Sequence, residues 1–315
     1  MRLATVHGRE GARAAVLVGR GGGALWVSIA DAARDLLGDD GCPDSLVGLL
    51  RRDGPGLATP RRIVEALGDD GPPAEIGRWN PSEARLAAPI PDPGAFLDFY
   101  SFEGHVRAAR ARRGLDVPLE WFKNPAYYRS NQRSFIGDGE AVCFPVGETM
   151  MDYELELAAV LGAPVASPTA ERAEAAIAGF CLLNDWSARA IQREVMAVGL
   201  GPNKGKDFAT SLGPWLVTPD EVGDLASVEL SARVNAEEWS RGSMADMHWS
   251  WGEMLAFAAE GARLEPGDVL GSGTLPGGCG LEQGRFLEIG DLVELDGGDT
   301  FGVLRGTVRR REATR

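Results

Sequence analysis

Apolar and polar positions in the first part of the chain predict two strands followed by three short helices. Segments 2–6 and 12–18 are rich in Val, Leu and Ala and lie on either side of a glycine-containing turn, which is typical of a β-hairpin. Stretches with helical character follow at 29–37, 45–52 and 60–67. The last has Thr59 in the N-cap position and Pro60 as its first helical residue. Few residues in this part suggest chemistry.

A stretch rich in Asp, Gly and Pro, from residue 68 to 94, interrupts this pattern. It contains Gly71-Pro72-Pro73 and Pro89-Ile90-Pro91-Asp92-Pro93, which is typical of a connection between domains. A chain of 315 residues also favours one large domain with a smaller one. We therefore place a boundary near residue 85, which predicts a small N-terminal domain, 1–85, and a larger domain, 86–315.

The larger region is predicted to be rich in strands. The tract 141–161 has strand-like alternation, and a predicted helix from Thr169 to Ala178, stopped by Gly179, precedes an apolar strand at 180–184. Segment 228–234 also alternates apolar and polar residues for most of its length. Two similar turns between strand-like runs lie at 265–268 and 288–291. The overall expectation is an α+β, β-rich fold.

Charge and composition exclude several functional classes. The formal net charge of -14 argues against the basic surface that binding of nucleic acid or an anionic membrane would require, so we expect neither as a partner. No apolar run approaches the roughly 20 residues that span a bilayer, and the first residues lack the apolar segment of a signal peptide. We expect a cytoplasmic protein.

The cysteines and one glycine-rich loop are expected to be structural. Cys42, Cys143, Cys181 and Cys279 form no pair at metal or redox spacing, which favours reduced packing residues over a disulfide framework. The loop 19–24 fits the loose spacing of a dinucleotide-binding motif, but a strand-like segment follows it where that motif requires a helix. A hairpin loop is the better interpretation.

Acidic residues recur at spacings that suit a metal site. Glu154 and Glu156 are two residues apart, so on a strand both carboxylates leave the same face, a costly arrangement unless a cation joins them. An exposed strand with alternating charge is the alternative. The apolar strand 180–184 leads directly to Asp185, which could supply a third oxygen ligand at the rim of the sheet. Alternatively, Asp185 or Ser187 could cap the helix that follows.

A further candidate segment runs from Asp98 to His105. His105 is one of three histidines, and it lies near both an aspartate and a tyrosine in a glycine-containing segment that could form a mobile lid. An unremarkable surface or core histidine is the alternative. The arginines that follow, at 107, 110, 112 and 113, are expected to form a solvated helix face, although one could close on a substrate carboxylate.

The order of these motifs resembles the fumarylacetoacetate hydrolase family over roughly residues 86 to 310. The resemblance is carried by Asp98-Phe99-Tyr100 with His105, Asp152-Tyr153-Glu154-Leu155-Glu156, Asn184-Asp185-Trp186-Ser187-Ala188-Arg189 with Gln192, Gly205-Lys206-Asp207-Phe208-Ala209-Thr210, and Gly271-Ser272-Gly273-Thr274. It implies a catalytic domain with a mixed β-sandwich roll, usually homodimeric, that holds Mg²⁺, Mn²⁺ or Ca²⁺. The first 85 residues resemble the variable N-terminal domain of such proteins only loosely.

The resemblance also implies a role for individual residues. The implied metal ligands are Asp98, Glu154, Glu156 and Asp185, with Lys206 and Thr210 beside the metal. His105 would be the general base, Glu282 would orient it, and Lys206 would assist catalysis. The implied substrate contacts are Tyr100, Tyr128, Arg189, Gln192 and Thr274. Ala190, Met196 and Asp207 depart from the family pattern and bear on which substrate is used more than on the metal site.

The expected activity is hydrolysis of a carbon–carbon bond beside a ketone in a small anionic β-diketo acid, of the fumarylacetoacetate or acylpyruvate type. Carboxylate ligands suit hard cations, and a β-diketo acid can chelate such a cation through two oxygens, which also stabilises the departing enolate. Two alternatives remain open. One is other metal-enolate chemistry, such as 2-hydroxydienoate hydration or oxaloacetate decarboxylation or tautomerisation. The other is a non-catalytic role in a biosynthetic pathway.

Overall fold

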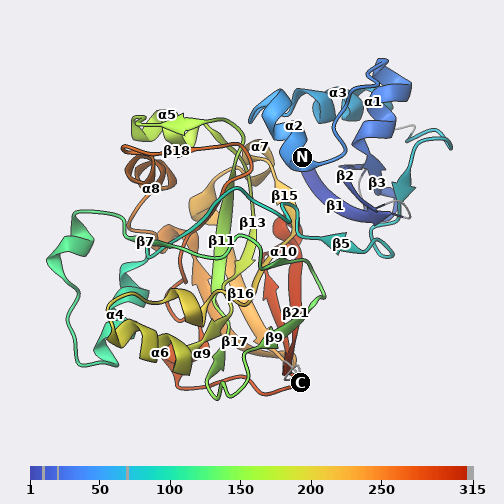
Figure 1. Ribbon diagram of the computed structural model, residues 1–315. Coiled ribbons are helices and arrows are strands. Elements are labelled where there is room, and N and C mark those ends of the chain that lie inside the picture. The colour runs from blue at the N-terminus through green and yellow to red at the C-terminus, as the bar shows by residue number, and fades with distance from the viewer. Residues whose placement is uncertain (9–10, 20, 69–70, 311–315) are drawn as a thin grey trace.

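A large mixed sheet dominates the fold, with helices at its periphery (Figure 1). The computed structural model describes residues 1–8, 11–19, 21–68 and 71–310. Within them this sheet has 12 strands, in the order β4 (Arg78–Trp79), β3 (Leu25–Ser28), β2 (Gly11–Val18), β1 (Arg2–Gly8), β15 (Thr210–Val217), β13 (Ile177–Asn184), β11 (Leu155–Leu161), β19 (Val269–Gly271), β6 (Phe96–Phe99) and β7 (Tyr127–Arg129), with β5 (Leu86–Ala87) beside β1 and β8 (Phe135–Ile136) beside β15.

A second sheet of five strands packs against the middle of the first. Its order is β17 (Glu237–Ser243), β16 (Glu229–Val234), β20 (Leu292–Asp296), β21 (Val303–Arg310) and β9 (Ala141–Phe144). Leu157 and Leu182 of the large sheet share one apolar core with Leu230 and Val293 of the second. This arrangement confirms the predicted β-rich, mixed fold. Two small sheets pair β10 (Met151–Asp152) with β14 (Ser187–Ala188) and β12 (Val165–Ala166) with β18 (Arg263–Leu264).

Three N-terminal helices cover the opposite face of the same central strands. They are α1 (Ile29–Leu37), α2 (Leu46–Asp53) and α3 (Ala58–Leu67). Leu49 and Ile63 of these helices share a core with Val160 of β11 and Leu183 of β13. Because β11 and β13 are covered on both faces, every residue in them is buried. A polar side chain within these strands therefore has to find its partners inside the protein.

The N-terminal strands extend the large sheet. The predicted hairpin is confirmed, since β1 pairs with β2 in antiparallel fashion, and its turn residues 9–10 lie outside the described residues. β1 also pairs with β15, with Leu3 opposite Leu216. The N-terminal strands thus belong to the same sheet as the strands of the larger region, and the division at residue 85 stays a prediction.

The glycine-rich loop and both predicted turns have the expected form. β2 and β3 pair in antiparallel fashion, and the 3₁₀ turn Gly21–Gly23 lies between them, while Arg20 lies outside the described residues. In the two turns, an aspartate carboxylate accepts a hydrogen bond from the backbone N–H three residues earlier, at Asp268 and at Asp291. Among the described residues, no helix is long and apolar enough to cross a membrane.

The N-cap predicted for the third helix is wrong. The residue in the cap position is Leu57, whose side chain cannot accept a hydrogen bond, and Thr59 lies inside α3. Asp53 performs the capping instead, because its carboxylate accepts a 2.8 Å hydrogen bond from the Thr59 N–H. The helix is therefore capped by Asp53, a residue that lies outside the local N-cap sequence pattern.

The helix predicted from Thr169 to Ala178 is shorter than expected. Thr169 does cap it, but α5 (Ala170–Glu174) ends four residues before Ala178. Ile177 and Ala178 belong to β13, where Ile177 lies opposite Leu161 of β11. Pairing with a buried neighbouring strand outweighs the local helical preference of these residues. The remaining helices are α4 (Glu103–Ala111), α6 (Arg189–Ala197), α7 (Pro219–Val222), α8 (Trp251–Ala258), α9 (Gly280–Gln283) and α10 (Gly298–Phe301).

Candidate active site

Four buried carboxylates come from neighbouring strands of the large sheet. Asp98 lies on β6, Glu154 immediately precedes β11, Glu156 lies on β11, and Asp185 immediately follows β13. The strand order β13-β11-β19-β6 brings them to one region of the sheet. All four are at most 5 % exposed, so the alternative of an exposed, charged strand at Glu154 and Glu156 is wrong.

Three of these carboxylates are arranged as a cation would require. Oxygen atoms of Asp98, Glu154 and Asp185 all lie within 4.8 Å of one another. One carboxylate oxygen of Asp98, one of Asp185 and the hydroxyl of Thr210 are buried without a hydrogen-bond partner. Buried polar atoms rarely stay unpaired, and an all-oxygen set suits Mg²⁺, Mn²⁺ or Ca²⁺. The residues present therefore fit a hard divalent cation.

Two buried cations offset part of this negative charge. Lys206 Nζ lies 2.6 Å from Glu154 and 2.7 Å from Asp185, and Arg189 contacts Glu154 at 2.8 Å. Burial alone would raise the pKa of Glu154, but Lys206 and Arg189 outweigh it and lower this pKa to about 2. Burial would also lower the pKa of Lys206, yet Asp185 and Glu154 raise it. Lys206 thus faces the site and stays protonated.

Lys206 also lowers the pKa values of Asp98 and Glu156, but it does not outweigh their burial. Burial raises the pKa of Asp98 well above its ordinary value, and the charge of Asp185 adds to the effect. Burial, together with Asp98, raises the pKa of Glu156 in the same way. These two groups therefore hold a proton more readily than ordinary carboxyl groups when no metal ion is bound. A divalent cation would reverse this preference by stabilising the carboxylates.

Gly271 provides the space in which Asp98 and Glu156 lie. It is opposite Asp98 in the parallel pairing of β19 with β6 and opposite Ala158 of β11. A Cβ atom at Gly271 would collide with Asp98 Oδ1 and lie 3.0 Å from Glu156 Oε2. Both neighbours are carboxylate atoms of the candidate site. The lack of a side chain at Gly271 therefore allows the carboxylates of Asp98 and Glu156 to occupy their observed positions.

Replacing Gly271 with Ala is expected to weaken Mn²⁺ binding by at least about tenfold, because Asp98 would have to move from the cluster. Titration calorimetry on the folded variant would measure the change. Gly56→Ala is a suitable control, since none of the described atoms outside its chain neighbours lies within 4 Å of a Cβ there and its backbone conformation suits an L residue. Equal Mn²⁺ affinity in the wild type and Gly271→Ala would exclude this role for Gly271.

A histidine–glutamate pair lies beside the carboxylates. His105 is on α4 and Glu282 is on α9, and His105 Nδ1 lies 2.6 Å from Glu282 Oε1. Both side chains are at most 8 % exposed. Since a carboxylate can only accept, Nδ1 carries the hydrogen and Nε2 is left able to accept a proton. Once protonated, His105 would also lower the pKa of Glu154, which links the pair to the carboxylate cluster.

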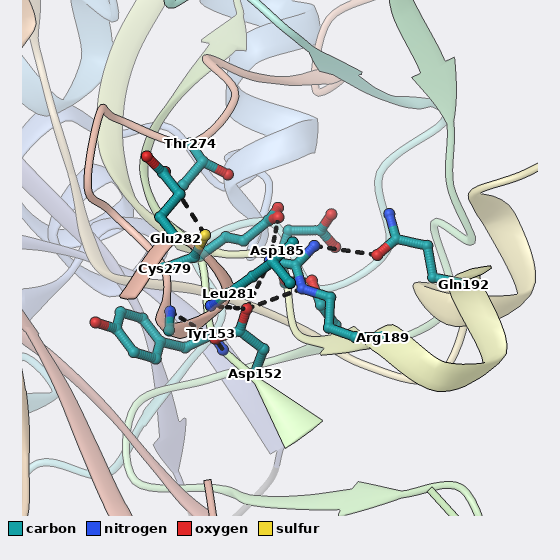
Figure 2. A network of polar contacts seen from close by, with 12 residues as sticks. Asp152, Tyr153, Asp185, Arg189, Gln192, Thr274, Cys279, Leu281 and Glu282 are labelled. Carbon is teal, nitrogen blue, oxygen red and sulfur yellow. Dashed lines mark hydrogen bonds and ion pairs between the residues drawn. The ribbon is translucent and has the colours of Figure 1, made fainter. Parts of the chain in front are cut away.

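Asp152 connects Arg189, which contacts the carboxylate cluster, with α9, which carries Glu282. No role was predicted for Asp152 from the sequence. Figure 2 shows its carboxylate between Arg189 and the backbone of α9. It accepts hydrogen bonds from the N–H groups of Gly280 and Leu281 and forms a 2.8 Å ion pair with Arg189. Arg189 in turn contacts Glu154. The signal in the sequence that could have identified Asp152 is its position two residues before Glu154.

The residues expected to contact substrate surround the same cluster. The Tyr128 hydroxyl donates to Asp185, Thr274 donates to Glu156 at 3.3 Å, and Arg189 donates to Gln192 at 3.1 Å. Tyr100 is half-buried, with its ring 5.3 Å from that of His105, and burial raises its pKa to about 12. The structure therefore places Tyr128 and Thr274 against the carboxylates, Tyr100 beside His105 and Gln192 beside Arg189.

The alternative that Asp185 or Ser187 caps the following helix is wrong. α6 begins with Ala188 as its cap residue, and the Ser187 hydroxyl donates to the Asp185 carbonyl. Glu148 supplies the cap, since its carboxylate accepts hydrogen bonds from the N–H groups of Ala190 and Ile191. Asp185 is thus left to face the carboxylate cluster.

The fold and the site define a protein with a buried oxygen-ligand cluster beside a histidine–glutamate pair. Residues 95–309 match the family described as fumarylacetoacetate (FAA) hydrolase C-terminal. The chain belongs to this family. A putative hydrolase of Burkholderia multivorans is 33 % identical over 218 residues, which are 68 % of this chain and 73 % of the relative. A 2,4-didehydro-3-deoxy-L-rhamnonate hydrolase of Sphingomonas sp. is 31 % identical over 216 residues, with the same coverage.

Solved structures share the fold over nearly the whole chain. The 5-carboxymethyl-2-hydroxymuconate delta-isomerase of Mycobacterium smegmatis superposes with a TM-score of 0.71 at 24 % identity, covering 99 % of this chain and 100 % of that one. The maleylpyruvate hydrolase of Sphingobium sp. SYK-6, in complex with manganese and pyruvate, has a TM-score of 0.72 at 22 % identity and the same coverage. The fold thus occurs in both hydrolases and isomerases, and one such structure contains a divalent metal.

Proposed function

We propose that this protein is a divalent-metal-dependent hydrolase that cleaves a carbon–carbon bond in a β-diketo acid of the acylpyruvate or fumarylacetoacetate type. The observation that carries the proposal is the His105–Glu282 pair beside the buried carboxylates. An enzyme that only stabilises an enolate needs the metal ligands but no base that activates water. The two curated relatives are both named as hydrolases, which supports the same choice.

The proposed metal ligands are Asp98, Glu154, Glu156 and Asp185, with Lys206 and Thr210 beside the ion. When bound, Mg²⁺, Mn²⁺ or Ca²⁺ would supply positive charge that holds the oxygens of the diketo acid and stabilises the departing enolate. Burial of these carboxylates favours tight binding of the ion because water competes less for it. The pyruvate present with manganese in the maleylpyruvate hydrolase structure is also the product that acylpyruvate cleavage releases.

In the proposed reaction, His105 Nε2 takes a proton from water as the oxygen attacks the ketone carbon. Glu282 holds the imidazole in the required tautomer and stabilises the imidazolium. The resulting tetrahedral oxyanion collapses, the carbon–carbon bond breaks, and its electron pair leaves as an enolate. That enolate takes up a proton from the imidazolium to give the second product. Water and substrate thus yield two carboxylic acids.

The cationic side chains and the remaining polar groups hold the substrate in this proposal. Lys206 is a buried, protonated donor whose charge can stabilise the oxyanion, a contribution typically worth about 3 kcal/mol. The residues that would contact the substrate are Arg189, Gln192, Tyr100, Tyr128 and Thr274. We further propose a small anionic substrate, a homodimeric assembly and a cytoplasmic location.

Product analysis tests the proposal directly. Purified protein incubated with acylpyruvates, fumarylacetoacetate and oxaloacetate, with and without Mg²⁺, is expected to release pyruvate or acetoacetate only from the diketo acids and only with metal. Decarboxylation of oxaloacetate without any cleavage of diketo acids would favour the metal-enolate alternative. The isomerase among the similar structures makes tautomerisation the second reaction to monitor.

A further inference from the structure

A second group of potential metal ligands lies next to the carboxylate cluster and has a different chemical character. His105, Cys279 and Glu282 each offer one atom, and the three atoms lie within 4.8 Å of one another. The His105 Nδ1 to Glu282 Oε1 distance is 2.6 Å, and the Cys279 Sγ to Glu282 Oε1 distance is 3.7 Å. One nitrogen, one sulfur and one oxygen form a donor set typical of zinc and unsuited to magnesium.

We propose that His105, Cys279 and Glu282 form an inhibitory site for Zn²⁺, separate from the oxygen-ligand cluster. The inhibitory part rests on the proposed role of His105. Zinc bonds of about 2.0–2.3 Å in a tetrahedron place ligand atoms about 3.3–3.7 Å apart, so the three side chains need to move only slightly. A zinc ion bound to His105 Nδ1 replaces the hydrogen bond to Glu282 and removes the base from its working position.

The charges around Cys279 favour a cation. Asp152, Glu154 and Glu282 act on this residue with negative charge, and Arg189 acts against them. A thiolate, a carboxylate and a neutral imidazole would also cancel the charge of one Zn²⁺ ion, which reduces the cost of burying it. Figure 2 shows Cys279 directed toward Glu282, at the start of α9.

Burial of Cys279 argues against a reactive thiol as the alternative. The residue is fully buried, and burial raises the pKa of its thiol well above the ordinary value. Reactive cysteines are partly exposed and have a lowered pKa, so attack by an oxidant in solution is disfavoured. A bound metal ion displaces the thiol proton, which makes ligation the more accessible chemistry for this group.

The direct test uses Co²⁺ as a spectroscopic probe on the full chain with Mg²⁺ at saturation. The wild type is expected to bind one Co²⁺ per chain with a thiolate charge-transfer band, and Zn²⁺ should abolish the band. Cys279→Ser should lose it, whereas Cys143→Ser, which removes an exposed thiol, should keep it. Absence of the band in the wild type, or an unchanged band in Cys279→Ser, would overturn the proposal.

A second variant guards against misfolding of Cys279→Ser. His105→Asn removes the nitrogen donor and should weaken Co²⁺ binding by about tenfold or more while the thiolate band stays detectable at high cobalt. Unchanged cobalt affinity in His105→Asn would contradict the proposed ligand set. These measurements need no substrate, so they decide the zinc site even if acylpyruvate cleavage is never observed.

Inhibition is measured separately with an acylpyruvate substrate. Zn²⁺ is expected to inhibit the wild type in the presence of saturating Mg²⁺, and Cys279→Ser should require about tenfold more Zn²⁺ for the same effect. The inhibition of each protein is measured relative to its own rate without zinc. Equal sensitivity of the two proteins would show that zinc acts elsewhere, for example by replacing Mg²⁺.

Discussion

Replacing His105 with Asn is expected to lower kcat for acylpyruvate cleavage by about 100- to 10,000-fold, the usual contribution of a general base. The asparagine cannot take a proton from water, yet it can still donate a hydrogen bond to Glu282. Binding of Mn²⁺ and the melting temperature should change little, because Asp98, Glu154 and Asp185 all remain. Steady-state kinetics, titration calorimetry and thermal melting on the same samples would separate these effects.

Two further variants sharpen this prediction. Glu282→Gln should reduce kcat by a smaller factor, because it disturbs the tautomer of His105 without removing the base. His7→Asn is the matched control, since His7 lies exposed on β1, and its kcat should equal that of the wild type. Wild-type rates in His105→Asn would refute general-base catalysis by this residue.

Removal of the divalent metal is expected to abolish activity and lower the melting temperature by several degrees. A ligand that binds only the folded state at 100 times its Kd stabilises it by about 2.7 kcal/mol, and chelation removes that contribution. Mg²⁺ or Mn²⁺ should restore both properties. Scanning calorimetry with chelator and with added metal would measure the effect, and identical melting curves would rule out the site.

Glu154→Gln and Glu156→Gln should each abolish the response of the melting temperature to metal. Glu148 is not a suitable control, although the sequence suggests that it is dispensable. It is buried and accepts hydrogen bonds from the backbone N–H groups of four residues: Thr149, Met150, Ala190 and Ile191. Glu194→Gln, at an exposed position on α6, is the better matched control and should respond to metal like the wild type.

The apparent affinity for metal should also rise with pH. Asp98 and Glu156 have raised pKa values in the metal-free protein, so at lower pH they hold protons that the ion must displace. At pH values below those pKa values, raising the pH removes competing protons and therefore strengthens metal binding. Calorimetry in buffers of different ionisation enthalpy would detect the released protons, and an affinity independent of pH would contradict this linkage.

The β-rich fold and the residues of the candidate site can both be predicted from the amino-acid sequence. Strands that are covered on both faces must be apolar, so the segment 180–184 was recognisable, and the carboxylate that follows it had to lie at a strand end. The spacing of Glu154 and Glu156 was informative for a related reason, because paired carboxylates within apolar surroundings need a partner. Both features are local, so they can be recognised from neighbouring residues in the sequence.

Contacts between groups that are far apart in the chain become visible in the tertiary structure alone. His105 and Glu282 are 177 positions apart in the chain, and no local pattern encodes their 2.6 Å contact. The same limit explains the three helix errors, where Asp53, Glu148 and the pairing of Ile177 outweighed the local signals. Asp152 and Cys279 gained their significance in the same way. Periodicity reports which face of an element is buried, whereas hydrogen-bond partners depend on how the elements pack.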